Sequence, residues 1–230
     1  MQNIRFGLIG LMAREFASAA ARWGLFTEDV PRPEIVGVCS AVPKEFEWFK
    51  KNFPDIKYYE EDYKELLKRD DIDVIYCAVP HQLHERFYVD AIRAGKSLLG
   101  EKPFGIDKAA NDAILQAIAE HPEVIVRCTS EFPYYPAVQK MIQWAKEGKY
   151  GKIIEVRSGF HHSSDMDLNK PINWKRQVKT NGEYGWRPRY PYPACAVPPG
   201  LFAEDGVCGL LRPGEGASRR QGRHGEVRYL

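Results

Sequence analysis

The sequence predicts an α/β fold, a doubly wound parallel (Rossmann) sheet followed by an incomplete α+β substrate domain and an irregular tail. Over the first 125 residues, short apolar runs alternate with amphipathic stretches, which is typical of a parallel sheet with helices on both faces. Residues 186–230 lack this periodicity, and they hold six Pro, seven Gly, seven Arg and no Lys. That composition predicts a tail without packed elements.

Strands are expected where short apolar runs are bounded by polar or turn residues. Pro80 ends one such run, Gly95 stops a helix, and Asp107 is a suitable N-cap for the helix that follows it. The predicted strands are 4–10, 34–39, 73–80, 97–100, 124–128 and 152–158, and the predicted helices are 13–23, 44–52, 62–68, 84–94, 108–119 and 136–147. Residues 159–185 are polar and are expected to form a loop.

Composition and charge exclude several classes of protein. No apolar run approaches the roughly 20 residues that cross a bilayer, and no leader precedes the first strand, so no membrane partner and a cytoplasmic location are expected. The net charge is +2, but residues 1–185 hold 26 basic and 27 acidic residues, which argues against a nucleic-acid partner. The five cysteines are scattered singly and are expected to be free, mostly buried thiols.

The turn after the first strand is the expected site for a dinucleotide pyrophosphate, because a helix N-terminus offers free N–H groups there. Gly7, Gly10, Leu11 and Met12 are the candidate cofactor-binding residues of this turn. The glycine fingerprint is incomplete, since Met12 and Glu15 stand where the second and third glycines are usual. We therefore expect weak binding, and the alternative is that Gly7 and Gly10 only allow close packing.

Ser40 stands at the end of the second strand, where an acid usually holds the ribose hydroxyls of NAD. A neutral residue does not repel a 2′-phosphate, so the expected cofactor is NADP or NAD. Lys44 or Arg14 could contact such a phosphate, and the alternative is that both are solvated surface charges.

The segment from Asp73 to Asp107 carries the most specific pattern in the chain. A strand ends in Pro80, His84 follows, a helix closes in Ala94-Gly95-Lys96, and a strand delivers Glu101-Lys102-Pro103 before the capping Asp107. These residues, in this order, resemble the Gfo/Idh/MocA family of NAD(P)-dependent oxidoreductases, and the resemblance runs from Ile4 to about Gly185.

The resemblance implies hydride transfer to or from a secondary alcohol of a sugar or cyclitol. It assigns the catalytic proton transfer to Lys102, and it places Pro80, His81 and Glu101 against the cofactor. His84 is a second catalytic candidate, with a hydrogen-bonded structural histidine as the alternative. It also implies a small polyol or sugar substrate and, commonly, a homo-oligomer. No metal is expected, because residues 161–167 hold ligand types without a helical pair or distant partner.

The resemblance stops after Gly185, where the family continues with Asp-x-Gly-x-x-His or Asp-x-Gly-x-His. Residues 186–195 can be encoded so that reading one base later gives Gly-Asp-Leu-Gly-Ile-His. Our hypothesis is that a frameshift near Gly185 replaced the rest of the protein. The predicted domains are then 1–125 for the dinucleotide, 126–185 for part of a substrate domain, and 186–230 as a non-native tail. Activity is expected to be impaired, and a non-catalytic nucleotide-binding protein is the alternative.

Overall fold

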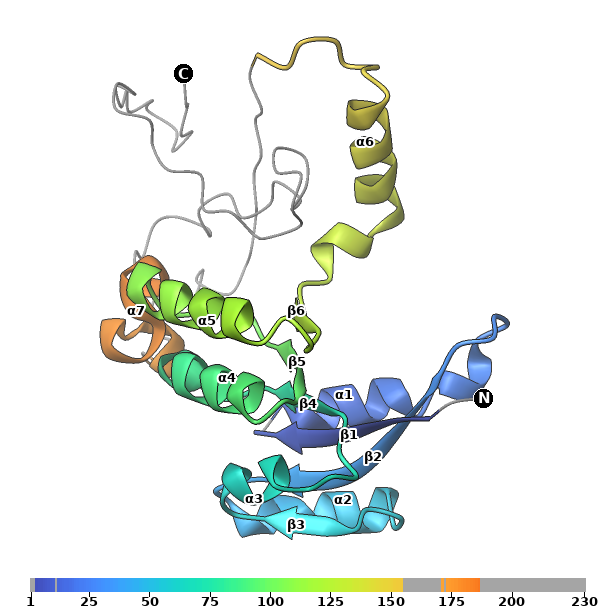
Figure 1. Ribbon diagram of the computed structural model, residues 1–230, viewed down its shortest axis with the longest axis vertical. Helices are drawn as coiled ribbons and strands as arrows, with labels where there is room; N and C mark the ends of the chain where they lie inside the picture. The colour runs from blue at the N-terminus through green and yellow to red at the C-terminus, as the bar shows by residue number, and fades with distance from the viewer. Residues whose placement is uncertain (1–2, 11, 155–170, 172, 187–230) are drawn as a thin grey trace. The chain divides into compact units, whose positions relative to one another are not determined.

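A computed structural model describes residues 3–10, 12–154, 171 and 173–186 (Figure 1). Its centre is a six-stranded sheet in the order β3-β2-β1-β4-β5-β6, with every neighbouring pair parallel. This order confirms the predicted doubly wound fold. The strands are β1 (Asn3–Ile9), β2 (Arg32–Cys39), β3 (Tyr58–Glu60), β4 (Val74–Cys77), β5 (Ser97–Gly100) and β6 (Val126–Cys128).

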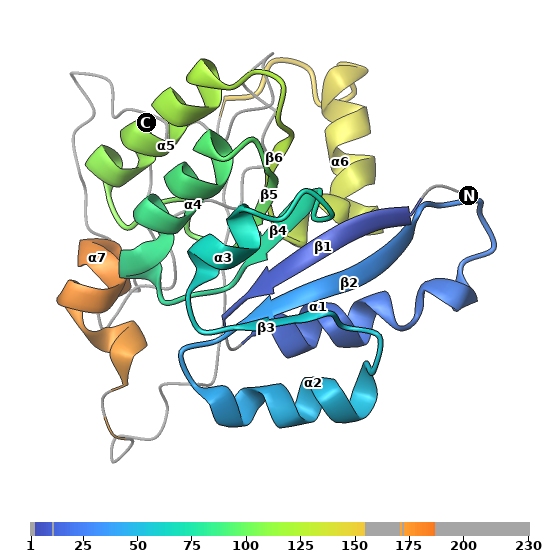
Figure 2. The same ribbon diagram turned by 60° about the horizontal axis from the view of Figure 1, so that its bottom comes forward.

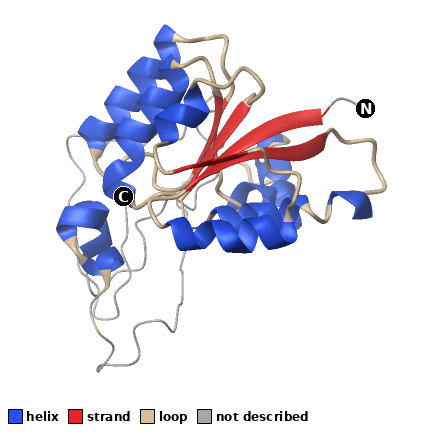
Figure 3. Ribbon diagram, turned by 90° about the horizontal axis from the view of Figure 1, so that it is seen from below, coloured by secondary structure: helices blue, strands red, loops and turns tan. Residues whose placement is uncertain are grey.

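Helices cover both faces of the sheet (Figures 2 and 3). On one face lie α1 (Ala13–Ala20) and α2 (Phe46–Asn52), and on the other lie α3 (Tyr63–Leu67), α4 (His84–Arg93) and α5 (Lys108–Glu120). The other described helices are α6 (Pro136–Lys146) and α7 (Val178–Trp186). Five short 3-10 turns complete the described elements: η1 (Trp23–Leu25), η2 (Pro43–Glu45), η3 (His81–Leu83), η4 (Phe132–Tyr134) and η5 (Trp174–Arg176).

Two hydrophobic layers hold the sheet, because successive strand residues face opposite sides. Phe6, Leu8 and Tyr76 pack with α1 and α2 on one face. Ile75 and Cys77 pack with α3, α4 and α5 on the other. Both faces of the central strands are therefore buried, as the continuous apolar runs predicted.

Several boundaries differ from the sequence prediction. The strand β3 was not predicted, because a three-residue edge strand is too short to show periodicity. The predicted strand 73–80 is shorter, since β4 ends at Cys77 and the chain turns into the loop before η3. The predicted helix 13–23 ends at Ala20, and a turn follows in which Trp23 Nε1 donates to the Val30 carbonyl at 3.0 Å. Residues 152–154 form no strand, and 155–158 lie outside the described residues.

The chain divides into two compact units, one built from residues up to Thr129 together with Val178–Glu183, and one that includes residues from Ser130 to Gln177.

The loop predicted for 159–185 is wrong for its last part, because α7 forms there. Gly182 interrupts α7 with φ 72°, and a Cβ at this residue would lie 3.2 Å from the carbonyl carbon of Ile106. This close approach between distant segments cannot be read from sequence patterns.

Candidate dinucleotide site

The carboxyl ends of β1, β2, β4 and β5 meet at one edge of the sheet, because parallel strands all point the same way. Backbone hydrogen bonds join the residues that leave these strands: Gly10 N–H to Cys39 at 3.0 Å, Ala78 N–H to Ile9 at 2.8 Å, and Glu101 N–H to Cys77 at 3.1 Å. This edge thus brings together Gly10 and Glu101, two candidates that lie 91 residues apart in sequence.

Gly10 makes the turn from β1 to α1, and no other residue type fits there. Its φ is 101°, which L-residues rarely adopt. A Cβ at this position would also meet the backbone of Ala78, 2.7 Å from its carbonyl carbon and 3.1 Å from the nitrogen of Val79. Gly10 therefore lets the β1 turn lie directly against the β4 loop.

The other residues of the turn divide in their roles. Gly7 lies inside β1, and a Cβ there would contact Ile75 and Ile72 at 3.0 and 3.2 Å, which fits the alternative of close packing; its role as a cofactor-binding residue stays a prediction. Met12 is the N-cap of α1, and its side chain is 52% exposed where the fingerprint has its second glycine. Leu11 lies outside the described residues.

Ser40 follows β2 and is buried. Its Oγ accepts a hydrogen bond from the Val42 N–H at 3.1 Å, which holds the start of the loop to η2. Glu45, the last residue of η2, forms an ion pair with Arg14 of α1, and its Oε2 lies 2.5 Å from Arg14 Nη2. Lys44 beside it is exposed. The position after β2 that usually holds an acid is therefore occupied by Ser40, and the carboxylate nearby belongs to Glu45.

Glu101, Lys102 and Pro103 are held at three points. Tyr76 of β4 donates to the Glu101 carboxylate at 2.9 Å, and Tyr88 of α4 donates to the Glu101 carbonyl at 2.7 Å. His84 lies 2.7 Å from the Pro103 carbonyl through Nδ1. The Lys102–Pro103 peptide bond is cis, and Lys102 is exposed. The segment is thus fixed around a lysine whose side chain reaches solvent.

His84, the second catalytic candidate, is buried, with 0% exposure. Its two ring nitrogens face backbone carbonyls, Nδ1 that of Pro103 at 2.7 Å and Nε2 that of Val79 at 2.9 Å. Burial lowers the pKa of His84 below its ordinary value, although the two carbonyls oppose this change. Both ring nitrogens thus contact the backbone, which favours the alternative of a hydrogen-bonded structural histidine, and the role of His84 stays a prediction.

Tyr76 and Tyr88 belong to the site but were not predicted. Tyr76 stacks on Phe16 with ring centroids 4.7 Å apart, and Tyr88 stacks on His84 at 4.8 Å. Burial raises the pKa of both hydroxyls, so both remain donors. The one available signal was a tyrosine inside an otherwise aliphatic strand, since a buried hydroxyl needs a partner.

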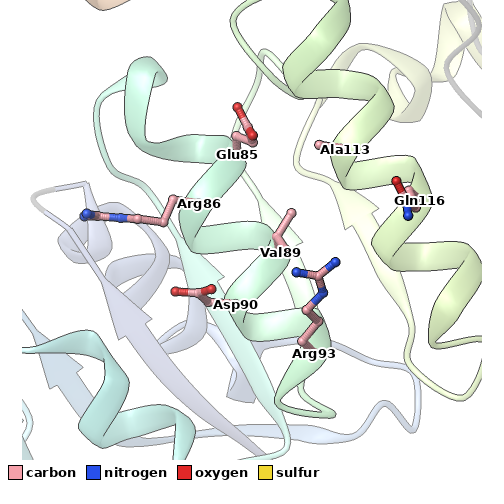
Figure 4. Close-up of a pocket in the computed structure, with 7 residues that line it drawn as sticks. All are labelled: Glu85, Arg86, Val89, Asp90, Arg93, Ala113 and Gln116. Carbon is pink, nitrogen blue, oxygen red and sulfur yellow. The ribbon is translucent and has the colours of Figure 1, made fainter.

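Two remaining candidates follow β4. Pro80 is exposed and is the N-cap of η3, and His81 is buried at the start of η3. A hollow elsewhere in this unit lies between α4 and α5 and is lined by Glu85, Arg86, Val89, Asp90, Arg93, Ala113 and Gln116 (Figure 4). None of the predicted site residues lines it. The predicted residues 161–167 lie outside the described part of the chain.

The strand order, the glycine turn and the strand-end loops define a dinucleotide-binding fold of the Rossmann type. The family model described as "Oxidoreductase family, NAD-binding Rossmann fold" (GFO_IDH_MocA) matches residues 4–129, more than half of the chain. The chain belongs to this family, as the resemblance in the sequence implied. No helix among the described residues is long and apolar enough to cross a membrane.

Curated relatives include enzymes named for sugars. Levoglucosan dehydrogenase of Pseudarthrobacter phenanthrenivorans is 24% identical over 184 residues, which cover 79% of this chain and 47% of that protein. A dTDP-3,4-didehydro-2,6-dideoxy-alpha-D-glucose 3-reductase of Actinomadura kijaniata is 31% identical over 100 residues, covering 44% of this chain and 30% of the relative. This chain therefore spans at most about half the length of these relatives.

Solved structures show the same fold. An oxidoreductase domain protein from Kribbella flavida gives a TM-score of 0.73 at 24% identity, covering 79% of this chain and 49% of that chain. A scyllo-inositol dehydrogenase from Lactobacillus casei, solved with NAD(H) and scyllo-inositol, gives 0.57 at 25% identity, covering 66% and 43%. Family and fold are thus established from two independent comparisons.

Proposed function

We propose that this chain carries the cofactor half of an NAD(P)-dependent oxidoreductase that acts on a secondary alcohol of a sugar or cyclitol. The observation that carries the proposal is the fixed Glu101-Lys102-Pro103 segment at the same sheet edge as the Gly10 turn. Relatives named for levoglucosan and scyllo-inositol support the substrate class.

The residues of the edge fit a dinucleotide at the Gly10 turn. Gly10 keeps the backbone free of a side chain there, the α1 N-terminus follows, and Ser40 presents no charge to the ribose. Met12 adds a side chain where the backbone usually approaches the pyrophosphate, so we expect weak binding. When bound, the nicotinamide would accept or supply the hydride.

In this proposal Lys102 exchanges a proton with the substrate hydroxyl. Hydrogen bonds hold its backbone in place: Tyr76 and Tyr88 donate to Glu101 before it, and the His84 ring contacts the Pro103 carbonyl after it. A side chain on a fixed backbone loses less entropy when it is positioned for reaction. His84 acts in the proposal by fixing this backbone, and Glu101 and Pro80 line the cofactor.

The proposal is tested by titrating the full chain with NADH and NADPH while energy transfer from tryptophan to the nicotinamide is followed. We expect saturable binding of at least one dinucleotide, with a dissociation constant near 1 mM, equivalent to about −4 kcal/mol. Nicotinamide mononucleotide serves as the control ligand, because it lacks the adenosine half. Absence of binding by both dinucleotides at several times this concentration would remove the proposal.

A non-catalytic nucleotide-binding protein is the second candidate. It is favoured by one observation, the absence of an Asp-x-Gly-x-x-His or Asp-x-Gly-x-His sequence after Gly185. Hydride transfer to levoglucosan or scyllo-inositol, assayed at saturating dinucleotide, separates the two candidates. The cytoplasmic location, the homo-oligomer and the domain boundaries at 125 and 185 stay predictions.

A further inference from the structure

An ion pair joins the two elements that begin at the ends of β1 and β2. Arg14 lies in the first turn of α1, directly after the Gly10 turn, and Glu45 lies in η2, five residues after Ser40. Their side chains meet with Nη2 and Oε2 2.5 Å apart, and they are 36% and 21% exposed. The pair therefore bridges α1 and η2 beside the strand end where a Rossmann fold places the adenosine ribose.

The Arg14 guanidinium is held in place but has donors to spare. Its central carbon lies over the Trp48 ring, 5.2 Å from the ring centroid, and this cation–π contact helps to hold the group there. Its Nε is shielded from solvent and has no hydrogen-bond acceptor among the described residues. A guanidinium carries five N–H donors in a fixed fork, so a single carboxylate contact leaves other N–H donors available for a further acceptor.

We propose that Arg14 receives the 2′-phosphate of NADP and that Glu45, by competing for Arg14, sets the discrimination between NADP and NAD. This inference rests on the proposed function, because it assigns the adenosine end of the same dinucleotide site.

The charges support this competition. A phosphate monoester carries close to two negative charges and three acceptor oxygens, and Arg binds such groups through two parallel hydrogen bonds. Glu45 carries one negative charge at the same guanidinium and repels an incoming phosphate. NAD presents only hydroxyls there, so its binding leaves the Arg14–Glu45 pair intact.

The experiment compares two ligands that differ only in the 2′-phosphate, 5′-AMP and adenosine 2′,5′-bisphosphate, titrated by calorimetry into the full chain. Glu45→Gln removes the competing charge, and Arg14→Gln removes the receptor. Glu47→Gln is the matched control, because Glu47 lies on α2, pairs with Lys50 and is 73% exposed, and its loss changes the net charge equally.

We expect Glu45→Gln to raise the affinity for the bisphosphate about tenfold and that for 5′-AMP less than twofold. Arg14→Gln should remove the difference between the two ligands, and Glu47→Gln should leave both affinities within twofold. Equal changes for both ligands in Glu45→Gln, or an unchanged ligand ratio in Arg14→Gln, would overturn the inference while leaving dinucleotide binding intact. If NADH and NADPH also fail to bind, the proposed function falls together with it.

Discussion

Two constraints act on Gly10, a positive φ and a close contact with the backbone of Ala78. Gly10→Ala should therefore destabilise the fold more than a glycine-to-alanine change at a position with only one of these constraints. The positive φ of 101° costs an L-residue about 1–2 kcal/mol. The new Cβ would also meet the Ala78 backbone, 2.7 Å from its carbonyl carbon, and forcing atoms into a packed site costs about 1–3 kcal/mol. The free energy of unfolding should therefore fall by about 3 kcal/mol.

Two other glycines separate these contributions. Gly95 has φ 71° and open space around its Cβ position, so Gly95→Ala should cost only the backbone strain, about 1 kcal/mol. Gly24 has neither constraint, and Gly24→Ala should be neutral or stabilising by up to about 1 kcal/mol. Urea unfolding followed by far-UV circular dichroism gives all three values. If Gly10→Ala costs no more than Gly95→Ala, the tight contact between the β1 turn and the β4 loop is refuted.

Four further predictions concern the site and the tail. Lys102→Ala should lower turnover by about a hundredfold in a protein with the downstream motif restored, and unchanged turnover would contradict its proton-transfer role. Because Lys102 is exposed, the same change should alter the free energy of unfolding by less than about 0.5 kcal/mol. Because burial lowers the pKa of His84 in the folded state, the unfolded chain binds a proton at this histidine at a higher pH than the folded chain does. The free energy of unfolding should therefore fall as pH drops below about 6.5, and His84→Leu should lack this component of the pH profile. Met12→Gly should tighten dinucleotide binding several-fold in fluorescence titrations, and no change would place Met12 away from the pyrophosphate. Sequencing of the coding DNA should show codons after Gly185 that read Gly-Asp-x-Gly one base later, and any other reading removes the frameshift hypothesis.

The sequence determined the fold class because its signals are local. Apolar runs such as residues 74–77 pack on both faces of a parallel sheet, and the alternation with helices leaves few other topologies. The Asp107 cap was predicted from residue type, and its side chain does accept the Ala110 N–H at 2.8 Å. Family membership followed likewise from the order of residues between Asp73 and Asp107.

Only the tertiary structure decided which partners the individual site residues contact. His84 read as a catalytic candidate because histidine type and position are visible in the sequence, whereas the carbonyls of Val79 and Pro103 that enclose it are not. Tyr76 and Tyr88 reach Glu101 across 25 and 13 residues of chain. The Arg14–Glu45 pair likewise joins elements 31 residues apart. Periodicity and propensity report how a segment meets its own neighbours in sequence, but a side chain's partners depend on where parallel strands bring distant loops together.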